Sequence, residues 1–194
     1  MMKKRIIIGI SGASGVIYGI RLLQVLKDDL EIETHLVLTK GGKLNITLET
    51  DFDIKSIEAM ADVVHSDKNL GASIASGSFQ TLGMIIAPCS MKTLSGIVNS
   101  YATNLIVRAS DVILKESRQL IIVPRETPLH TGHCELIYKA SMMGAQIVPP
   151  NPAFYNNPES LDDIINHTVG RVLDLVGLDN DIVSRWEGVS FKNG

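Results

Sequence analysis

The stretch IIIGISGASGV, residues 6–16, decides the fold class of this chain. An apolar run rich in isoleucine ends in glycines spaced three apart, at Gly9, Gly12 and Gly15, and amphipathic sequence follows. This order is typical of a buried parallel strand that turns into a helix. Small residues in such a turn let backbone N–H groups and the positive helix end approach a phosphate. The stretch therefore predicts either a phosphate site or a turn in which glycine serves packing alone.

The alternation of strand and helix continues along the whole chain. Short β-branched runs occur at 5–10, 33–38, 83–87, 120–124 and 146–148, and helical patterns at 15–27, 93–100, 104–117, 129–143 and 160–176. Such alternation is the signature of βαβ units. We expect an α/β fold of three layers, with a doubly wound, mainly parallel sheet of the flavodoxin-like or Rossmann-like kind.

Size and charge narrow the function classes. With 194 residues, of which 45% are hydrophobic, the chain is expected to form one domain over 1–194. It has 18 basic and 21 acidic residues, a net charge of −3, and its Lys and Arg residues are scattered. The basic stripe of a nucleic-acid binder is missing, so we expect no nucleic-acid partner.

The apolar runs are the length of strands, well short of the roughly 20 residues that a membrane span needs. The start MMKK lacks the apolar region of a signal peptide. We therefore expect a cytoplasmic protein without a membrane partner. The two cysteines, Cys89 and Cys134, lack CxxC spacing and predict neither a disulfide framework nor a zinc site.

The residues after the first two strands favour a mononucleotide. The first turn reads GxxGxxG and departs from the GxGxxG of dinucleotide folds. Thr39 and Lys40 follow the run 33–38, where a dinucleotide fold usually has an acid for the ribose hydroxyls. These features favour FMN over NAD.

Two further strand ends carry polar groups. After 83–87 the chain reads Pro88 to Thr93, in which Ser90 is placed as an N-cap and Thr93 falls in the first helical turn. Capping alone would explain Ser90, whereas a second hydroxyl is what an anion or flavin site would add.

The run 120–124 leads into a proline-bracketed turn with Arg125 and Glu126. Arg125 can neutralise a phosphate, and a partly desolvated Glu126 could exchange protons near neutral pH. The alternative is solvated charge on a surface turn. Four charged residues also share one helical pattern upstream, where ion pairing on the helix surface is the plain interpretation: Arg108, Asp111, Lys115 and Arg118.

The sequence gives little support for a metal site or for acyl-transfer chemistry. His130 and His133 stand at i, i+3, but no third ligand with suitable spacing is nearby, so we expect no metal. The chain has no GxSxG elbow.

Taken together, these segments resemble the UbiX/Pad1 family of flavin prenyltransferases. The resemblance runs over nearly the full length, in the order GISGASG, THLVLTK, LETD, SGSF, PCSMKTLSGI, RASDVILKE, VPRETPLH, PPNPAFYNNPESLDDI and a terminal RW. Residues 66–75 match less well. Family members often have serine where this chain has Thr39, which keeps the hydroxyl.

The resemblance implies that reduced FMN attacks dimethylallyl monophosphate through N5 and C6, adding a ring and releasing inorganic phosphate. The product, prenylated FMN, would serve a UbiD-type decarboxylase. The older label of aromatic-acid decarboxylase would then describe that partner. The family's usual dodecamer has sites between subunits, and the C-terminal tail, about 177–194, is expected to pack on a neighbouring subunit.

The resemblance also implies roles for single residues. Those expected to hold FMN are Gly12, Ala13, Ser14, Thr39, Ser90, Met91, Lys92, Thr93 and Arg125. Those expected to bind the donor's phosphate are Lys115, Arg108, Tyr155 and Arg171. The expected catalytic residues are Glu126, Ser14, Glu49 and Trp186, of which Trp186 would wall the dimethylallyl pocket. Without the resemblance, Tyr155 could equally cap the sheet and Arg171 lie on a solvated helix face.

The chemistry agrees with this assignment. Breaking an allylic C–O bond builds negative charge on phosphate and positive charge on carbon, so fixed cations and a π-face stabilise the transition state. No DDxxD-type cluster is present to hold magnesium, and we expect a metal-independent reaction. Three alternatives remain: an aromatic or phenylacrylic acid decarboxylase, a decarboxylase of cysteine-derived carboxylates, and a non-catalytic flavin carrier. The second usually shows a PxMNxxMW segment, which this sequence lacks.

Overall fold

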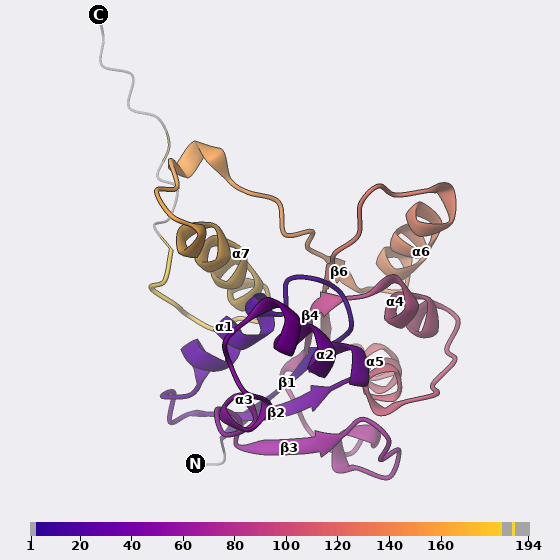
Figure 1. Cartoon of the computed structure of the whole chain (residues 1–194). Helices are drawn as coiled ribbons and strands as arrows, with labels where there is room; N and C mark the ends of the chain where they lie inside the picture. The colour runs from indigo at the N-terminus through magenta and orange to yellow at the C-terminus, as the bar shows by residue number, and fades with distance from the viewer. Residues whose placement is uncertain (1–2, 184–187, 189–194) are drawn as a thin grey trace, which may run out of the picture.

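One parallel sheet organises the part of the chain that the structure, a computed structural model, describes: residues 3–183 and 188. Within these residues it has six strands in the order β3-β2-β1-β4-β5-β6 (Figure 1). The strands are β1 Lys4–Ile10, β2 Ile32–Leu38, β3 Val63–Ser66, β4 Gly83–Cys89, β5 Gln119–Pro124 and β6 Gln146–Ile147. This is the Rossmann order, with a switch point between β1 and β4, and it confirms the predicted doubly wound α/β fold.

The central strand explains why the opening stretch decides the fold. β1 pairs with β2 through Ile7 and His35, and with β4 through Ile7 and Met84. Its isoleucines are buried on both faces, and β4 is buried along its whole length. A strand covered on both faces reads as a continuous apolar run, as the sequence has it.

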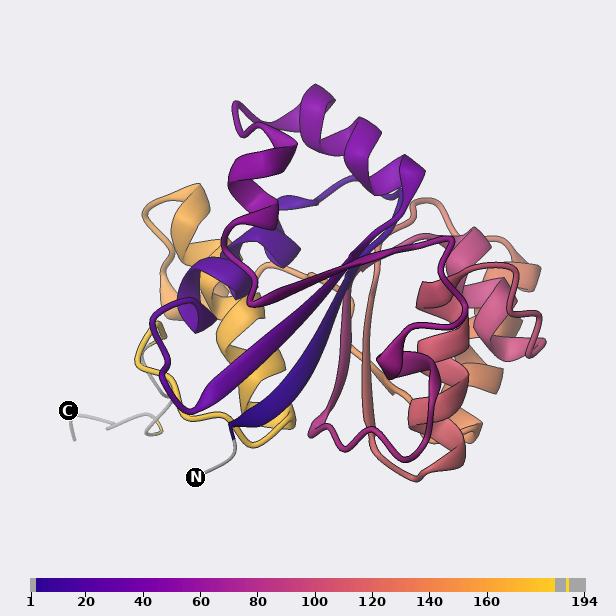
Figure 2. The ribbon, with the colours of Figure 1, turned by 90° about the horizontal axis from the view of Figure 1, so that it is seen from below.

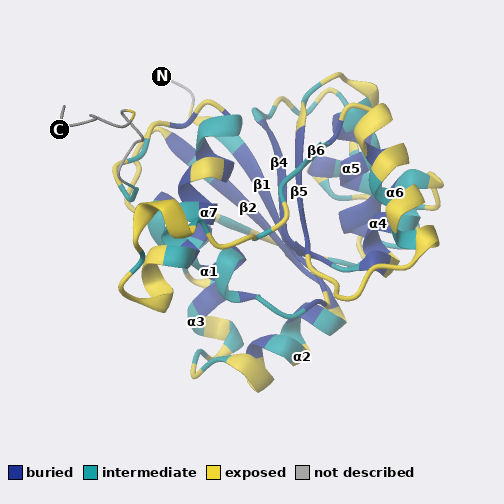
Figure 3. Ribbon diagram, turned by 90° about the horizontal axis from the view of Figure 1, so that it is seen from above, coloured by how far each residue is buried: buried dark blue, intermediate teal, exposed yellow. Residues whose placement is uncertain are grey.

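Helices cover the two faces of the sheet (Figures 2 and 3). On one face are α1 Ile17–Leu26, α2 Lys40–Glu49, α3 Ile54–Glu58 and α7 Leu161–Leu175. On the other are α4 Met91–Val98, α5 Leu105–Lys115 and α6 Thr131–Met142. Two hydrophobic clusters separate sheet and helices: Ile6, Ile8 and Ile10 of β1 belong to the first, and Ile7 belongs to the second.

Two α-helices and one strand were missed by the sequence reasoning. α2 has the sequence KGGKLNITLE and buries only Gly42 and Ile46, so it shows no continuous apolar stripe. α3 spans five residues, and β3 is a four-residue edge strand with alternating exposure. Short elements that bury few side chains leave a weak periodic signal.

The residues after α7 pack on their own chain as far as the structure describes them. Leu178 is buried, Ile182 packs against the first cluster, and Val183 lies against Gly170. The packing of the tail, about 177–194, on a neighbouring subunit stays a prediction. Trp186 lies outside the described residues. Within those residues, no helix is long and apolar enough to cross a membrane.

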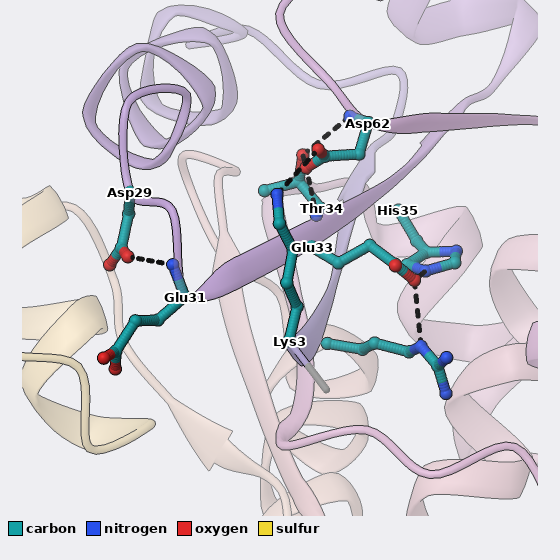
Figure 4. Close-up of polar contacts among 8 residues, drawn as sticks. Lys3, Asp29, Glu31, Glu33, Thr34, His35 and Asp62 are labelled. Atoms are coloured by element: carbon teal, nitrogen blue, oxygen red, sulfur yellow. Dashed lines mark hydrogen bonds and ion pairs between the residues drawn. The ribbon is translucent and has the colours of Figure 1, made fainter. Parts of the chain in front are cut away.

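A polar cluster joins β1, β2 and β3 at the second face. Glu33 Oε1 accepts a hydrogen bond from Arg5 Nε at 2.9 Å. The same oxygen pairs with His35 Nε2 at 2.8 Å, and Figure 4 shows the two side chains together. The other ring nitrogen of His35 lies 2.9 Å from Nε2 of His65. Burial, and secondarily the facing His35, lower the pKa of His65 below its ordinary value of 6.5.

This cluster makes stability depend on pH. An unfolded His65 takes up a proton below about 6.5, whereas the folded one does so only at lower pH, so the unfolded state binds more protons in that window. We predict that the free energy of unfolding falls as the pH drops below about 6.5. Urea titrations at pH 7.5 and 5.5, at one protein concentration, should show a smaller pH effect in His65→Gln. An unchanged pH effect in that variant would contradict the assignment.

Candidate functional site

A cavity of about 770 Å³ opens at the carboxyl ends of the central strands. This volume is within the roughly 300–1,000 Å³ of ligand pockets, and the switch point of a doubly wound sheet is where ligands bind. The cavity is lined by Gly12, Thr39, Lys40, Gly41, Asp67, Ser90, Lys92, Thr93, Ser95, Gly96, Asn99, Tyr101, Thr103, Asn104 and Val107.

Three helices begin at this cavity, each with a capping residue in the lining. Thr39 Oγ1 accepts from Gly42 N at 3.0 Å at the start of α2, and Ser90 Oγ accepts from Thr93 N at 3.2 Å at the start of α4. Asn104 Oδ1 accepts from Val107 N at 3.2 Å at the start of α5. Helix N-termini carry partial positive charge and favour anions.

Hydroxyls and cations accompany these helix starts. Thr39 and Thr93 are buried, and Ser90 Oγ donates to Thr93 Oγ1 at 3.1 Å. Lys40 and Lys92 are exposed where they line the cavity. The site therefore offers hydroxyl groups in the interior and positive charge towards solvent, a combination that suits a ligand with a phosphate.

Gly12 and Gly41 bring two backbones into direct contact at the cavity. A Cβ on Gly12 would lie 2.9 Å from Cα of Gly41, and a Cβ on Gly41 would lie 2.9 Å from Cα of Gly12. No real Cβ fits at that distance from a backbone atom without a shift of the chain. The loop after β1 and the start of α2 thus form a cradle that requires glycine on both sides.

The start of α1 is held by the chain's own carboxylate. Glu49, at the end of α2, accepts through Oε2 from Gly15 N at 2.8 Å and from Val16 N at 3.3 Å. These are the amides that the sequence suggested for a phosphate, and the structure places Glu49 on them, beside Ser14. Ala13 is buried and Ser14 half-buried in the same loop.

Arg125 and Glu126 lie on the turn after β5, and both are exposed. Arg125 N donates to the carbonyl of Cys89 at 3.2 Å, which holds this turn against the end of β4. Burial raises the pKa of Tyr18, and the nearby charge of Arg125 opposes that rise. Glu126 Oε1 accepts from Thr127 N at 3.0 Å. The turn thus borders the switch point without entering the lining of the cavity as described.

The residues expected to bind the donor's phosphate are not part of the cavity lining. α5 starts at the cavity and ends at Lys115, which is paired with Glu116 next to the amino end of β5. Arg108, the fourth residue of α5, binds Asp111 at 2.7 Å. Tyr155 precedes α7 and Arg171 lies on it, across the sheet from α4 and α5 (Figure 1). The cavity lining thus includes none of the four residues expected to bind the donor's phosphate.

Family and structural matches show what kind of protein this chain is similar to. The flavoprotein family model matches residues 1–173. The flavin prenyltransferase UbiX of Escherichia coli K12 is 58% identical over 187 residues, which cover 95% of this chain and 99% of that one. The UbiX of Thauera aromatica is 53% identical, with 95% and 94% covered.

Solved structures agree. A dodecameric FMN-dependent UbiX-like decarboxylase from Escherichia coli O157:H7 has a TM-score of 0.93 and 50% identity, covering 95% of this chain and 100% of that one. AnUbiX (PadA1), solved in complex with FMN and dimethylallyl pyrophosphate, has a TM-score of 0.94 and 43% identity, covering 97% and 100%.

The chain belongs to the UbiX family of flavin prenyltransferases.

UbiX membership disfavours the alternative of a cysteine decarboxylase. The peptidyl-cysteine decarboxylase EpiD is 16% identical with a TM-score of 0.63, so it shares the fold alone. The UbiX relatives match both in sequence and over nearly the whole length of each chain.

Several residues of this UbiX-family cavity were missed from the sequence. Asp67 Oδ1 accepts from Ile106 N at 3.2 Å, Oδ2 accepts from Asn104 Nδ2 at 3.0 Å, and burial raises the pKa of the carboxyl despite these bonds and the charge of Lys92. It follows β3, an unrecognised strand, so no signal marked it. Asn104, in contrast, stands before an amphipathic run and is recognisable as an N-cap.

The glycine cradle yields a prediction for flavin binding. Gly12→Ala should weaken FMN binding about tenfold or more, about 1.4 kcal/mol, because the new methyl group pushes the loop after β1 away from α2. Fluorescence titration with FMN measures this. The matched control is Gly71→Ala, where a Cβ meets only Asn69 Oδ1 at 3.5 Å. Equal FMN affinity in both variants would show that the cradle is not part of the flavin site.

Proposed function

We propose that this chain joins the dimethylallyl group of dimethylallyl monophosphate to N5 and C6 of reduced FMN, giving prenylated FMN and inorganic phosphate. One observation carries the proposal: the cavity at the β1–β4 switch point, with three helix starts around it, in a chain that matches an FMN-bound and dimethylallyl pyrophosphate-bound relative over 97% of its length. A UbiD-type decarboxylase would receive the product.

The residues at the cavity fit FMN. The helix starts at Thr39 and Ser90, with the buried hydroxyl of Thr93, suit one phosphate group. Gly12 and Gly41 have no side chains, so a flat ring system can approach the backbone closely where these two residues are in contact. Reduced FMN, when bound, supplies the nucleophilic N5 and C6. Its proposed ligands in this chain are Gly12, Ala13, Ser14, Thr39, Ser90, Met91, Lys92, Thr93 and Arg125.

Two carboxylates are proposed to handle protons. Glu49 is fixed on the amides next to Ser14, and Glu126 lies on the turn that Arg125 anchors to β4. Either carboxylate can take up a proton at an Oε atom and return it, while Ser14 can pass a proton between its hydroxyl and a neighbour. Arg125 supplies positive charge next to Glu126 in the same turn.

The donor's phosphate is proposed to bind Tyr155, Arg171 and Lys115, with Arg108 as a further cation. Within its own chain Lys115 lies at the far end of α5 from the cavity. The proposal therefore includes self-assembly, as a dodecamer, in which neighbouring subunits complete each site. Large exposed hydrophobic side chains outside the cavity are the surface that such contacts require: Leu129, Tyr138, Met142 and Phe154.

Side-chain cations at the leaving phosphate make a metal unnecessary in this proposal. A cytoplasmic location is also part of it, since the reaction consumes reduced flavin and the chain carries the free thiols Cys89 and Cys134.

The direct test incubates the protein anaerobically with reduced FMN and dimethylallyl monophosphate, with and without EDTA. We expect a flavin enlarged by one C5H8 unit, and release of inorganic phosphate, in both samples. A parallel sample with dimethylallyl pyrophosphate identifies the preferred donor. A flavin that stays unchanged with both donors would contradict the proposal and leave a flavin carrier. Release of CO2 from an aromatic acid without added decarboxylase would support the older label.

Glu126→Gln tests the proton role. The amide keeps the shape of the carboxylate but cannot accept a proton, so turnover should fall about 100-fold or more while FMN affinity stays near that of the parent chain. Anaerobic kinetics and FMN titration measure the two effects separately. A variant with nearly unchanged turnover would reduce Glu126 to a structural residue of its turn.

A further inference from the structure

His167 lies close to Tyr155 and on the same helix as Arg171, two of the proposed donor-binding residues. The hydroxyl of Tyr155 lies 3.3 Å from Nε2 of His167, and the two rings meet edge to face with centroids 6.0 Å apart. His167 lies on α7 four residues before Arg171, so both side chains leave the same helix face. His167 is half-buried, whereas Tyr155 and Arg171 are exposed.

Tyr155, His167 and Arg171 come from two elements. Tyr155 belongs to the short 3-10 turn Phe154–Asn156 in the proline-rich loop, and the other two belong to α7. The helix therefore fixes the position of His167 relative to Arg171. The contact with His167 in turn restricts the orientation of the phenol of Tyr155. A phenol has one proton, so the direction of this hydrogen bond decides where that proton goes.

Other charged groups around His167 are largely engaged elsewhere. Asp163, one turn earlier, accepts from the amides of Glu159 and Ser160 in the capping box of α7. Arg171 binds Asp174 at 2.8 Å. On the side of α1, Arg21 binds Asp162 at 2.8 Å and also contacts Asn166. His167 also lines a small hollow together with Ile182 and Val183. The segment that contains these two residues carries two further carboxylates, Asp179 and Asp181.

We propose that His167 is a positioning residue of the donor-phosphate site, which donates from Nε2 to the oxygen of Tyr155 and so turns the phenol proton towards the phosphate. This inference rests on the proposed function, in which Tyr155 and Arg171 bind that phosphate. If Nε2 accepted the hydrogen bond instead, the phenol would donate its proton to the imidazole and could not donate it to the phosphate. The imidazolium form, which donates from both nitrogens, always gives the productive direction.

Protonation links the arrangement to pH. Burial, and then the charge of Arg171, lower the pKa of His167 in the free protein. A phosphate dianion beside the ring has the opposite effect, because it favours the charged form. Binding of the donor therefore takes up a proton at His167, and by reciprocity a lower pH strengthens binding of the donor.

Two substitutions of His167 distinguish a positioning role from a purely structural one. His167→Gln keeps a side-chain N–H donor but does not titrate near neutral pH, and His167→Leu removes the donor. The phosphate monoester itself titrates near pH 6, and the Gln variant corrects for this because it binds the same substrate. Arg171→Ala reports whether the phosphate binds at this face at all.

The experiment measures kcat and KM for dimethylallyl monophosphate on the assembled, FMN-saturated protein at pH 6.5 and 8.0. We expect KM of the parent chain to be lower at pH 6.5 than at 8.0, and His167→Gln to lose this difference. His167→Leu should raise KM about tenfold with little change in kcat. FMN affinity and the size of the assembly, measured for each variant, should stay as in the parent chain.

Two results would overturn the inference, and they differ in what they leave standing. If His167→Gln keeps the pH dependence of KM and His167→Leu keeps its value, while Arg171→Ala raises KM, His167 has no positioning role and the proposed donor site stands. If Arg171→Ala and Tyr155→Phe also leave KM unchanged, the donor's phosphate binds elsewhere, and that part of the proposed function fails with the inference.

Discussion

Ser11 joins the ends of β1 and β4 at the point where the strand order reverses, and the site depends on this junction. Its hydroxyl donates to the carbonyl of Pro88 at 3.0 Å and accepts from Ser90 N at 2.8 Å, while its own N–H donates to the same carbonyl at 3.1 Å. The residue is fully buried. Losing the hydroxyl would leave the amide of Ser90 without this partner, at a cost of about 1–3 kcal/mol. The start of α4 would lose its fixed position relative to the loop after β1.

The cavity follows from this junction. With α4 fixed at Ser90 and α2 pressed against Gly12 through Gly41, two helix N-termini are held at one place before any ligand arrives. A site that is already formed has little ordering cost on binding. Glu49 supplies an anion to the start of a further helix nearby, α1, so the positive ends that open to the cavity are those of α2, α4 and α5.

The sequence predicted the framework because the buried strands β1, β2, β4 and β5 each leave a local signal of their own. The turn after β1, the cap at Ser90 and the turn at Arg125 follow apolar runs, and each lies at the expected sheet edge. The position of Glu49 on α1 could not be predicted, because it joins residues 34 positions apart through a helix with no apolar stripe. Asp67 was not predicted as a cavity residue for a similar reason, since it follows a four-residue edge strand. The distance of Lys115 from the cavity depends on the course of α5 across the sheet, which a residue pattern does not give.

The central claim is that helix starts at the switch point hold the single phosphate of FMN. Its most direct test compares the affinities of FMN, riboflavin and FAD by fluorescence titration, in the parent chain and in Ser90→Ala. Charge-assisted hydrogen bonds contribute about 1.5–3 kcal/mol each, so riboflavin, which lacks the phosphate, should bind roughly 100-fold more weakly than FMN. FAD should also bind more weakly than FMN, and Ser90→Ala should narrow the gap between FMN and riboflavin. Equal affinities for FMN and riboflavin would contradict the account.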